Sequence, residues 1–150
     1  ETLFKLADEM YLRAFDRLIE NDKGDDLGLM LFGAWVESMH LVINSSNGFE
    51  NSPKLNQFLA DQKLVAENLM AYLLDYSENE MVVHYSDKLS AVLNVFNGMN
   101  CTYPDSKVKH ETGTRSNIIR VSGGAKCKMN ETVFDNLKIA ISNIRTEIVD

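Results

Sequence analysis

Apolar residues recur at steps of three and four along the first twenty positions, and charged residues fill the positions between them. This spacing is typical of a helix with one apolar and one polar side. The pattern predicts that the helix ends within residues 21–24, where Gly24 would supply the backbone freedom of a C-terminal cap. The apolar positions are Leu3, Leu6, Ala7, Met10, Ala14 and Leu18.

Residues 27–43 are apolar on nearly every side of a helix, with Glu37 and His40 as the only ionisable interruptions. A helix of this kind belongs at the centre of a bundle. The run is shorter than the about 20 apolar residues that a membrane span requires, so we predict a buried core helix and no transmembrane segment.

Three further stretches predict amphipathic helices with clear starting signals. Residues 52–75 open with a Ser-Pro pair, which favours a helix start. Residues 77–98 open with a capping box in which Ser77 would be the N-cap, and Asn130 can cap a last helix that runs to the end of the chain. Short connections between successive helices force them to run antiparallel. The sequence therefore predicts one domain over residues 1–150, an all-α up-and-down bundle of about five helices.

Residues 100–129 depart from the helical pattern. An apolar run at 118–121, two glycines at 123 and 124, and residues 125–128 together predict a short β-hairpin around a glycine turn. Because an isolated hairpin is only marginally stable, we expect it to lean on the bundle. Cys101 and Cys127 flank this excursion. They are either bonded, with a stabilisation of about 3.5 kcal/mol from loop closure, or a pair of free thiols.

Charge is distributed unevenly along the chain. The formal net charge is -7, which argues against nucleic acid as a partner. Residues 101–129 nevertheless hold six basic and two acidic residues, a net charge of +4. The rest of the chain holds nine basic and twenty acidic residues, a net charge of -11. The excursion therefore either covers an acidic part of the bundle or faces an anionic partner. The candidate partner surface consists of Lys107, Lys109, Arg115, Arg120 and Lys126.

One Glu-x-x-His motif, Glu37 to His40, lies within the predicted central helix. Di-iron bundles use this spacing because it directs both side chains at one metal, but they need a second copy and two more glutamates. No second copy is present, since Met81 stands where His84 would require a glutamate. The two residues are then a hydrogen-bonded polar pair near the core, or, with Trp35, they line a ligand pocket. The sequence predicts no metal, no cofactor and no catalytic residue.

Two apolar stretches resemble a known group of proteins. They are residues 33–39 (GAWVESM) and the last helix from Phe134 to Val149. In these stretches, and in the order of its helices, the chain resembles all-helical lipoproteins of the bacterial cell envelope that have no assigned function. The resemblance implies a lipid anchor on a preceding N-terminal segment, a periplasmic or cell-surface location, and a disulfide between Cys101 and Cys127.

Two functional hypotheses follow. The first is a non-catalytic helical-bundle domain of the bacterial cell envelope that binds a partner protein or a small ligand through the basic excursion. The alternative is a bundle that binds a metal or cofactor at Glu37 and His40, and this alternative includes an enzyme. The residues alone leave a cytoplasmic location open.

Overall fold

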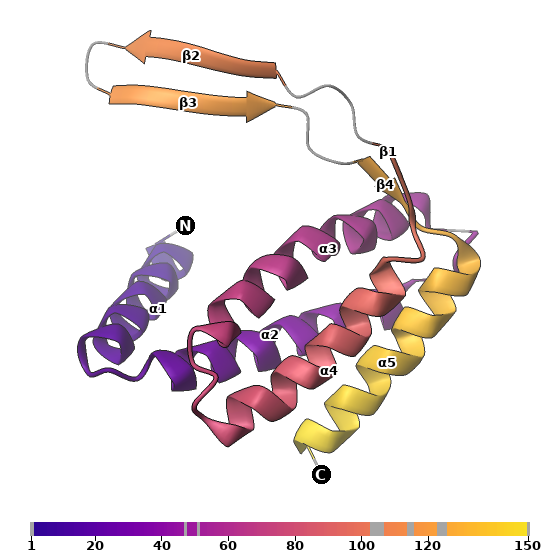
Figure 1. Cartoon of the computed structure of the whole chain (residues 1–150), viewed down its shortest axis with the longest axis horizontal. Helices are drawn as coiled ribbons and strands as arrows, with labels where there is room; N and C mark the ends of the chain where they lie inside the picture. The colour runs from indigo at the N-terminus through magenta and orange to yellow at the C-terminus, as the bar shows by residue number, and fades with distance from the viewer. Residues whose placement is uncertain are drawn as a thin grey trace.

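The computed structural model describes the backbone of residues 2–46, 48–50, 52–102, 107–113, 116–122 and 126–149, and the side chains of residues 10, 12–46, 48–50, 52–102 and 126–149. Within these residues it contains five helices and four short strands (Figure 1). The predicted all-α bundle is confirmed. The helices are α1 (Thr2–Glu20), α2 (Gly24–Ser45), α3 (Pro53–Leu74), α4 (Glu80–Phe96) and α5 (Glu131–Val149). The strands are β1 (Asn100–Thr102), β2 (Lys107–Gly113), β3 (Ser116–Ser122) and β4 (Lys126–Lys128).

Helices α2 to α5 form the bundle proper, and successive members run antiparallel (Figure 1). Each of the four contributes its apolar side to one continuous core. Burial of side chains of this size removes apolar surface from water at roughly 1.5–3 kcal/mol each, which is the main source of stability in such a bundle. The largest fully buried side chains are Phe32, Val36, Met39, Leu59, Leu73, Val82, Leu89, Val92, Phe96, Leu137 and Ile141.

The predicted starts of α3 and α5 are confirmed, whereas the predicted start of α4 is wrong. Helix α3 begins at Pro53 as predicted, and Asn130 Oδ1 accepts a hydrogen bond from Val133 N at 2.9 Å at the start of α5. The N-cap of α4 is Asn79 and not Ser77. Asn79 Oδ1 accepts from Met81 N at 2.9 Å, while its Nδ2 donates to Asp25 Oδ2 at 2.8 Å. Asn79 therefore starts α4 and also ties it to α2.

The turn between α1 and α2 differs from the prediction that Gly24 ends the first helix. Asp22 takes the left-handed conformation with φ 55°, and Lys23 N donates to Leu18 O at 2.8 Å while Asp22 N donates to Ile19 O at 3.1 Å. These two bonds are the Schellman motif. Gly24 instead begins α2, where a Cβ atom would overlap the ring of Tyr76. Glycine is needed there for close packing and not for a cap.

Helix α2 packs against α3, α4 and α5 and touches α1, so its predicted central position is confirmed. It is not buried on every side, however, because Met30, Ala34 and Leu41 are exposed along one stripe. By length and composition α2 is also the one helix among the described residues that could cross a membrane, although a core helix passes the same test.

The strands form two separate antiparallel pairs. Strand β1 pairs with β4, which we call the neck, and β2 pairs with β3, which we call the hairpin. The predicted pairing of residues 118–121 with 125–128 around the two glycines is therefore wrong. The seven-residue strand β3 finds a longer partner in β2, at a separation of two residues, and β4 reaches back to β1.

The hairpin does not lean on the bundle as expected. Within the described residues β4 contacts α3, whereas the main contacts of β2 and β3 are with each other. Figure 1 shows the hairpin beyond the neck, away from the ends of α4 and α5. The part of the basic excursion that lies beside a helix among the described residues is therefore β4, which carries Lys126 and Lys128 and contacts α3.

Candidate partner-binding site

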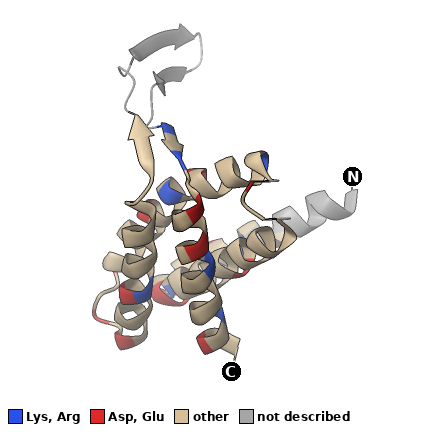
Figure 2. Ribbon diagram, turned by 90° about the vertical axis from the view of Figure 1, so that its right-hand side faces the viewer, with Lys and Arg blue, Asp and Glu red and all other residues tan. Residues whose placement is uncertain are grey.

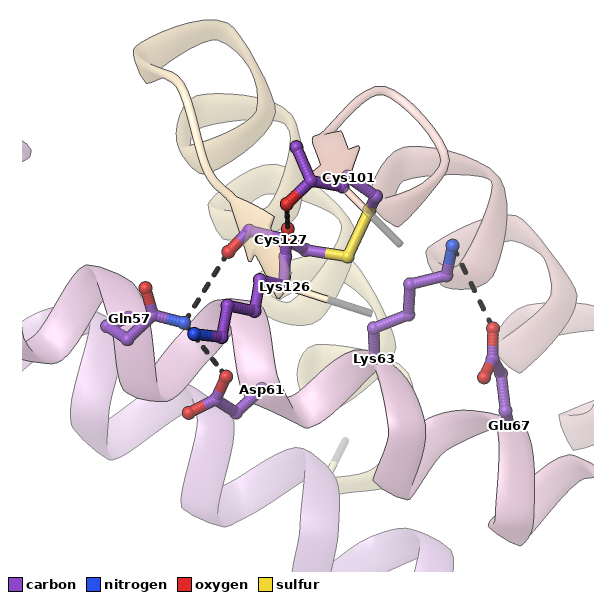
Figure 3. Close-up of a disulfide and its surroundings, with 8 residues drawn as sticks. Gln57, Asp61, Lys63, Glu67, Cys101, Lys126 and Cys127 are labelled. Carbon is purple, nitrogen blue, oxygen red and sulfur yellow. Dashed lines mark hydrogen bonds and ion pairs between the residues drawn. A yellow bond between two sulfur atoms is a disulfide. The ribbon is translucent and has the colours of Figure 1, made fainter. Parts of the chain in front are cut away.

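The neck is fixed covalently and also by contact with α3. Cys101 and Cys127 stand opposite each other in β1 and β4 and are joined by a disulfide (Figure 3). Gln57 of α3 donates from Nε2 to Cys127 O at 3.4 Å and to Asp61 Oδ1 at 2.9 Å. The neck therefore holds the two ends of the excursion together at the surface of α3.

The register of the hairpin gathers the basic residues on one side. Lys109 is paired with Arg120, and Lys107 lies two positions before Lys109 in the same strand. Because alternate residues of a strand belong to opposite faces, these three positions share one face of the hairpin. Lys126 is exposed in β4 at the neck. Arg115, the remaining predicted member of the partner surface, lies outside the described residues.

The opposite face of the hairpin carries the apolar positions Val108, Ile119 and Val121 and the polar positions His110, Thr112 and Asn117. Val108 pairs with Val121, and His110 pairs with Ile119. Acidic residues, by contrast, occur along the helices (Figure 2). The chain thus places a two-stranded, basic element outside an acidic bundle, an arrangement suited to contact with another molecule.

Glu37 does not pair with His40 as the sequence suggested. Arg145 of α5 donates from Nε to Glu37 Oε2 at 2.6 Å, and both side chains are partly exposed. This hydrogen bond is the main reason that the pKa of Glu37 lies below its usual value, and the charges of Arg145 and His40 lower it further. The carboxylate therefore joins α2 to α5 at the bundle surface.

His40 is likewise on the surface of α2. Asn44 Nδ2 donates to His40 O at 2.8 Å and lies 3.1 Å from its Nε2. Within the described residues no three His, Cys, Asp or Glu side chains are grouped so that they could hold a metal ion. The geometry gives the Glu-x-x-His motif two separate polar contacts instead of one site.

Trp35, the third predicted ligand-binding residue, belongs to the core. It is buried, and its Nε1 donates to Gln62 Oε1 of α3 at 3.3 Å. The indole is therefore satisfied by the fold itself, and Trp35, Glu37 and His40 do not converge on a common pocket.

The structure shows one ion-pair cluster that sequence reasoning missed. Glu147 of α5 bridges two residues of α4, with Oε2 at 2.7 Å from Lys88 Nζ and Oε1 at 2.5 Å from His84 Nε2. The hydrogen bond from Lys88, followed by that from His84, lowers the pKa of Glu147. The i,i+4 spacing of His84 and Lys88 places them on one side of α4, but no local signal identifies their partner 59 residues beyond Lys88.

A groove of about 440 Å³ between α4 and α5 was also missed. The small side chains of Ala91 and Ala140 create the hollow, and Val95, Ile139 and Ile144 make its walls mostly apolar. The apolar stripe of α4 or of α5 alone does not indicate that these two helices lie side by side.

Comparison with known proteins adds no relative to this picture. No protein-family model, no curated protein and no solved structure matches the chain. The resemblance to envelope lipoproteins therefore stays a prediction.

Proposed function

We propose that the chain is a non-catalytic binding domain that recognises an acidic partner protein through its basic hairpin, and that it works in the bacterial cell envelope. The observation that carries this proposal is the position of the hairpin beyond the neck, where its two described strands form a separate sheet (Figure 1).

The backbone of the hairpin supports a protein partner. A two-stranded hairpin in water is at best marginally stable and gains stability from a third strand or a packed surface. The described residues of β2 and β3 show pairing to each other alone, so each strand has an outer edge with free backbone groups. Such edges accept a strand from another chain, and the alternate side chains then provide specificity.

Charge supports an acidic partner. Lys107, Lys109 and Arg120 share one face of the hairpin, whereas the bundle has a large excess of acidic residues. An acidic surface is attracted to the hairpin and repelled by the helices. This difference would direct a partner to the hairpin and make association sensitive to salt.

The disulfide supports an extracytoplasmic location. Structural disulfides persist in oxidising compartments and are rare in the cytosol, where thiols are kept reduced. The bond between Cys101 and Cys127 is consistent with the periplasmic or surface location that the resemblance to envelope lipoproteins implies. A lipid anchor on a preceding segment belongs to the same proposal.

The alternative, a metal or cofactor site at Glu37 and His40, gains no support from the geometry. Arg145 donates a hydrogen bond to the carboxylate of Glu37, and His40 is hydrogen-bonded to Asn44. A metal would have to displace a cation from Glu37 without further described ligands nearby.

The test is capture of partners from a bacterial envelope extract by the immobilised chain. The hairpin–neck variant Lys107→Glu/Lys109→Glu/Lys126→Glu reverses two basic charges on the hairpin and one on the neck. A matched control, Arg13→Glu/Lys54→Glu/Lys138→Glu, changes the net charge equally at exposed positions on the helices.

We expect the hairpin–neck variant to capture at least tenfold less partner than the wild type, and the amount captured by the control to fall by less than twofold. Raising the salt concentration should weaken wild-type capture, because screening acts on exposed charges. Equal capture by the wild type and the hairpin–neck variant, or an equal loss in the control, would contradict the proposal.

A further inference from the structure

A small pocket lies at the base of the neck. Its lining comes from the loop before α3, from the first turns of α3 and from the end of β4, and its volume is about 290 Å³. Pockets for drug-sized ligands have volumes of about 300–1,000 Å³. A volume at the lower limit of this range suits a molecule of the size of an amino acid.

Contacts between these segments hold the pocket in shape. Asn56 Nδ2 of α3 donates to Phe49 O of the loop at 2.5 Å. Gln57 Nε2 of α3 donates to Cys127 O of β4 at 3.4 Å. The ring of Phe49 also packs against Phe134 of α5, with the ring centroids 5.8 Å apart. Because the walls are already tied together, a ligand meets a pocket with little left to order, which lowers the cost of binding.

Part of the lining is apolar. Phe49, Pro53 and Met129 supply this part. Phe49 and Met129 are partly buried and pack against the core, so their remaining exposed surface faces outward from a fixed position. An apolar group of a ligand that covers this surface gains free energy because both surfaces leave water.

The polar part of the lining carries two opposite charges. Glu50 and Lys128 both line the pocket and are exposed. Neither side chain forms an ion pair or a hydrogen bond within the part of the chain that the structure describes. A carboxylate and an ammonium group in one small pocket are complementary to the two charged groups of a zwitterion.

Two amide oxygens add to the hydrogen-bond acceptors of the pocket. Asn56 Oδ1 is buried and has no hydrogen-bond partner among the described residues. The side chain of Gln57 is bonded through its nitrogen, to Cys127 O and Asp61 Oδ1. A buried acceptor without a donor costs free energy, which a bound N–H group recovers. An ammonium group brings several donors and therefore suits these acceptors.

We propose that this pocket binds a zwitterionic α-amino acid with an apolar side chain. Glu50 and the two amide oxygens accept hydrogen bonds from its ammonium group, Lys128 donates to its carboxylate, and the apolar residues contact its side chain. This inference is independent of the hairpin and of any partner bound there.

NMR titration of the nitrogen-15-labelled full chain with L-leucine and L-phenylalanine tests the site. We expect saturable shifts of the backbone amides of Glu50 and Lys128 and of the side-chain amide of Gln57. For ligands of so few atoms we expect a dissociation constant of about 1 mM or lower. The absence of saturable shifts, or shifts confined to other parts of the chain, would overturn the inference.

Derivatives that lack one charge connect each ligand group to its residue. N-acetyl-leucine lacks the ammonium group and leucinamide lacks the carboxylate, and we expect each to bind at least fivefold more weakly than leucine. Glu50→Gln should weaken leucine at least fivefold and leave N-acetyl-leucine unchanged. Lys128→Gln should weaken leucine equally and leave leucinamide unchanged.

The control Glu78→Gln/Lys138→Gln removes one charge of each sign at exposed positions elsewhere, and should change leucine binding less than twofold. Equal binding of leucine and both derivatives, or an equal loss in the control, would reject the assigned contacts.

A short peptide is a second source of the same groups. The dipeptide Leu-Leu also has an ammonium group, a carboxylate and apolar side chains, but its charges are farther apart. We expect it to bind at least fivefold more weakly than leucine. Binding of the dipeptide as tight as that of leucine, or tighter, would assign the pocket to peptide ends and overturn the amino-acid ligand.

Discussion

The helices α2 to α5 and the hairpin β2–β3 are held together in different ways. Each of the four helices buries an apolar side against the others, so the core is sealed within one chain. The hairpin depends on pairing between its two strands. Below it, the disulfide closes the neck, and Gln57 of α3 holds the neck to the bundle. The helices therefore close their core within one chain, whereas each described strand of the hairpin keeps an unpaired outer edge. A binding function is best placed where the fold leaves such surface.

The largest expected effect separates the two regions directly. Leu137 is fully buried in α5, so Leu137→Ala should lower the free energy of unfolding by about 4 kcal/mol through lost burial and a cavity. Ile119→Ala in β3 should lower it by less than about 0.5 kcal/mol, because no described helix packs on that strand. Urea unfolding followed by circular dichroism measures both. Similar losses would mean that the hairpin is part of the core.

Removal of the disulfide tests the neck. Cys101→Ser/Cys127→Ser should lower the free energy of unfolding by about 3.5 kcal/mol, since the bond closes a loop between residues separated by 26 positions. The helix content should stay unchanged because the core is elsewhere. A reducing agent should destabilise the wild type similarly and leave the double variant unaffected. An unchanged stability in both tests would show that the loop is already closed by other contacts.

A smaller effect concerns the ion pair between α2 and α5. Arg145→Gln should raise the pKa of Glu37 towards its usual value, because the hydrogen bond that lowers this pKa is lost. In the wild type the pair stabilises the fold above the normal glutamate range, and this contribution disappears as the pH falls through the lowered pKa of Glu37. Carbon-13 NMR titration of Glu37 measures the shift. Lys88→Gln is the control and should leave Glu37 unaffected while it raises the pKa of Glu147.

The smallest effect is at the turn after α1. Asp22→Gly should raise the free energy of unfolding by about 0.5 kcal/mol, because Asp22 has a positive φ that glycine adopts more readily. Thermal unfolding should show an increase of about 1–2 °C. A decrease would indicate that the Asp22 side chain contributes more than its backbone strain costs.

The helices could be predicted because their signals are local. The apolar stripe of α5 and its capping residue Asn130 lie within one segment, and the structure places both as expected. The start of α3 at Pro53 is equally local. Errors arose where two local signals competed, as at Ser77 and Asn79, or at Asp22 and Gly24. In these cases a contact with another helix decided the outcome.

The candidate sites were less predictable because their partners are distant in sequence. Glu37 meets Arg145 across 108 positions, and no spacing within α2 indicates this. The predicted strand pairing was wrong for a similar reason, since β1 and β4 lie at opposite ends of the excursion in the sequence and pair with each other. The sequence shows that residues 101–129 are basic, but it does not indicate where this segment lies relative to the bundle.

Native-state hydrogen exchange of the isolated chain tests most directly whether the bundle is complete and the hairpin is not. We predict that amides of α2 to α5 around Leu89, Phe96 and Leu137 exchange only with global unfolding. Amides of β2 and β3 should exchange with opening free energies several kcal/mol lower, and should become protected when a partner from the extract is added. Equal protection of the hairpin and the core in the isolated chain would contradict this account.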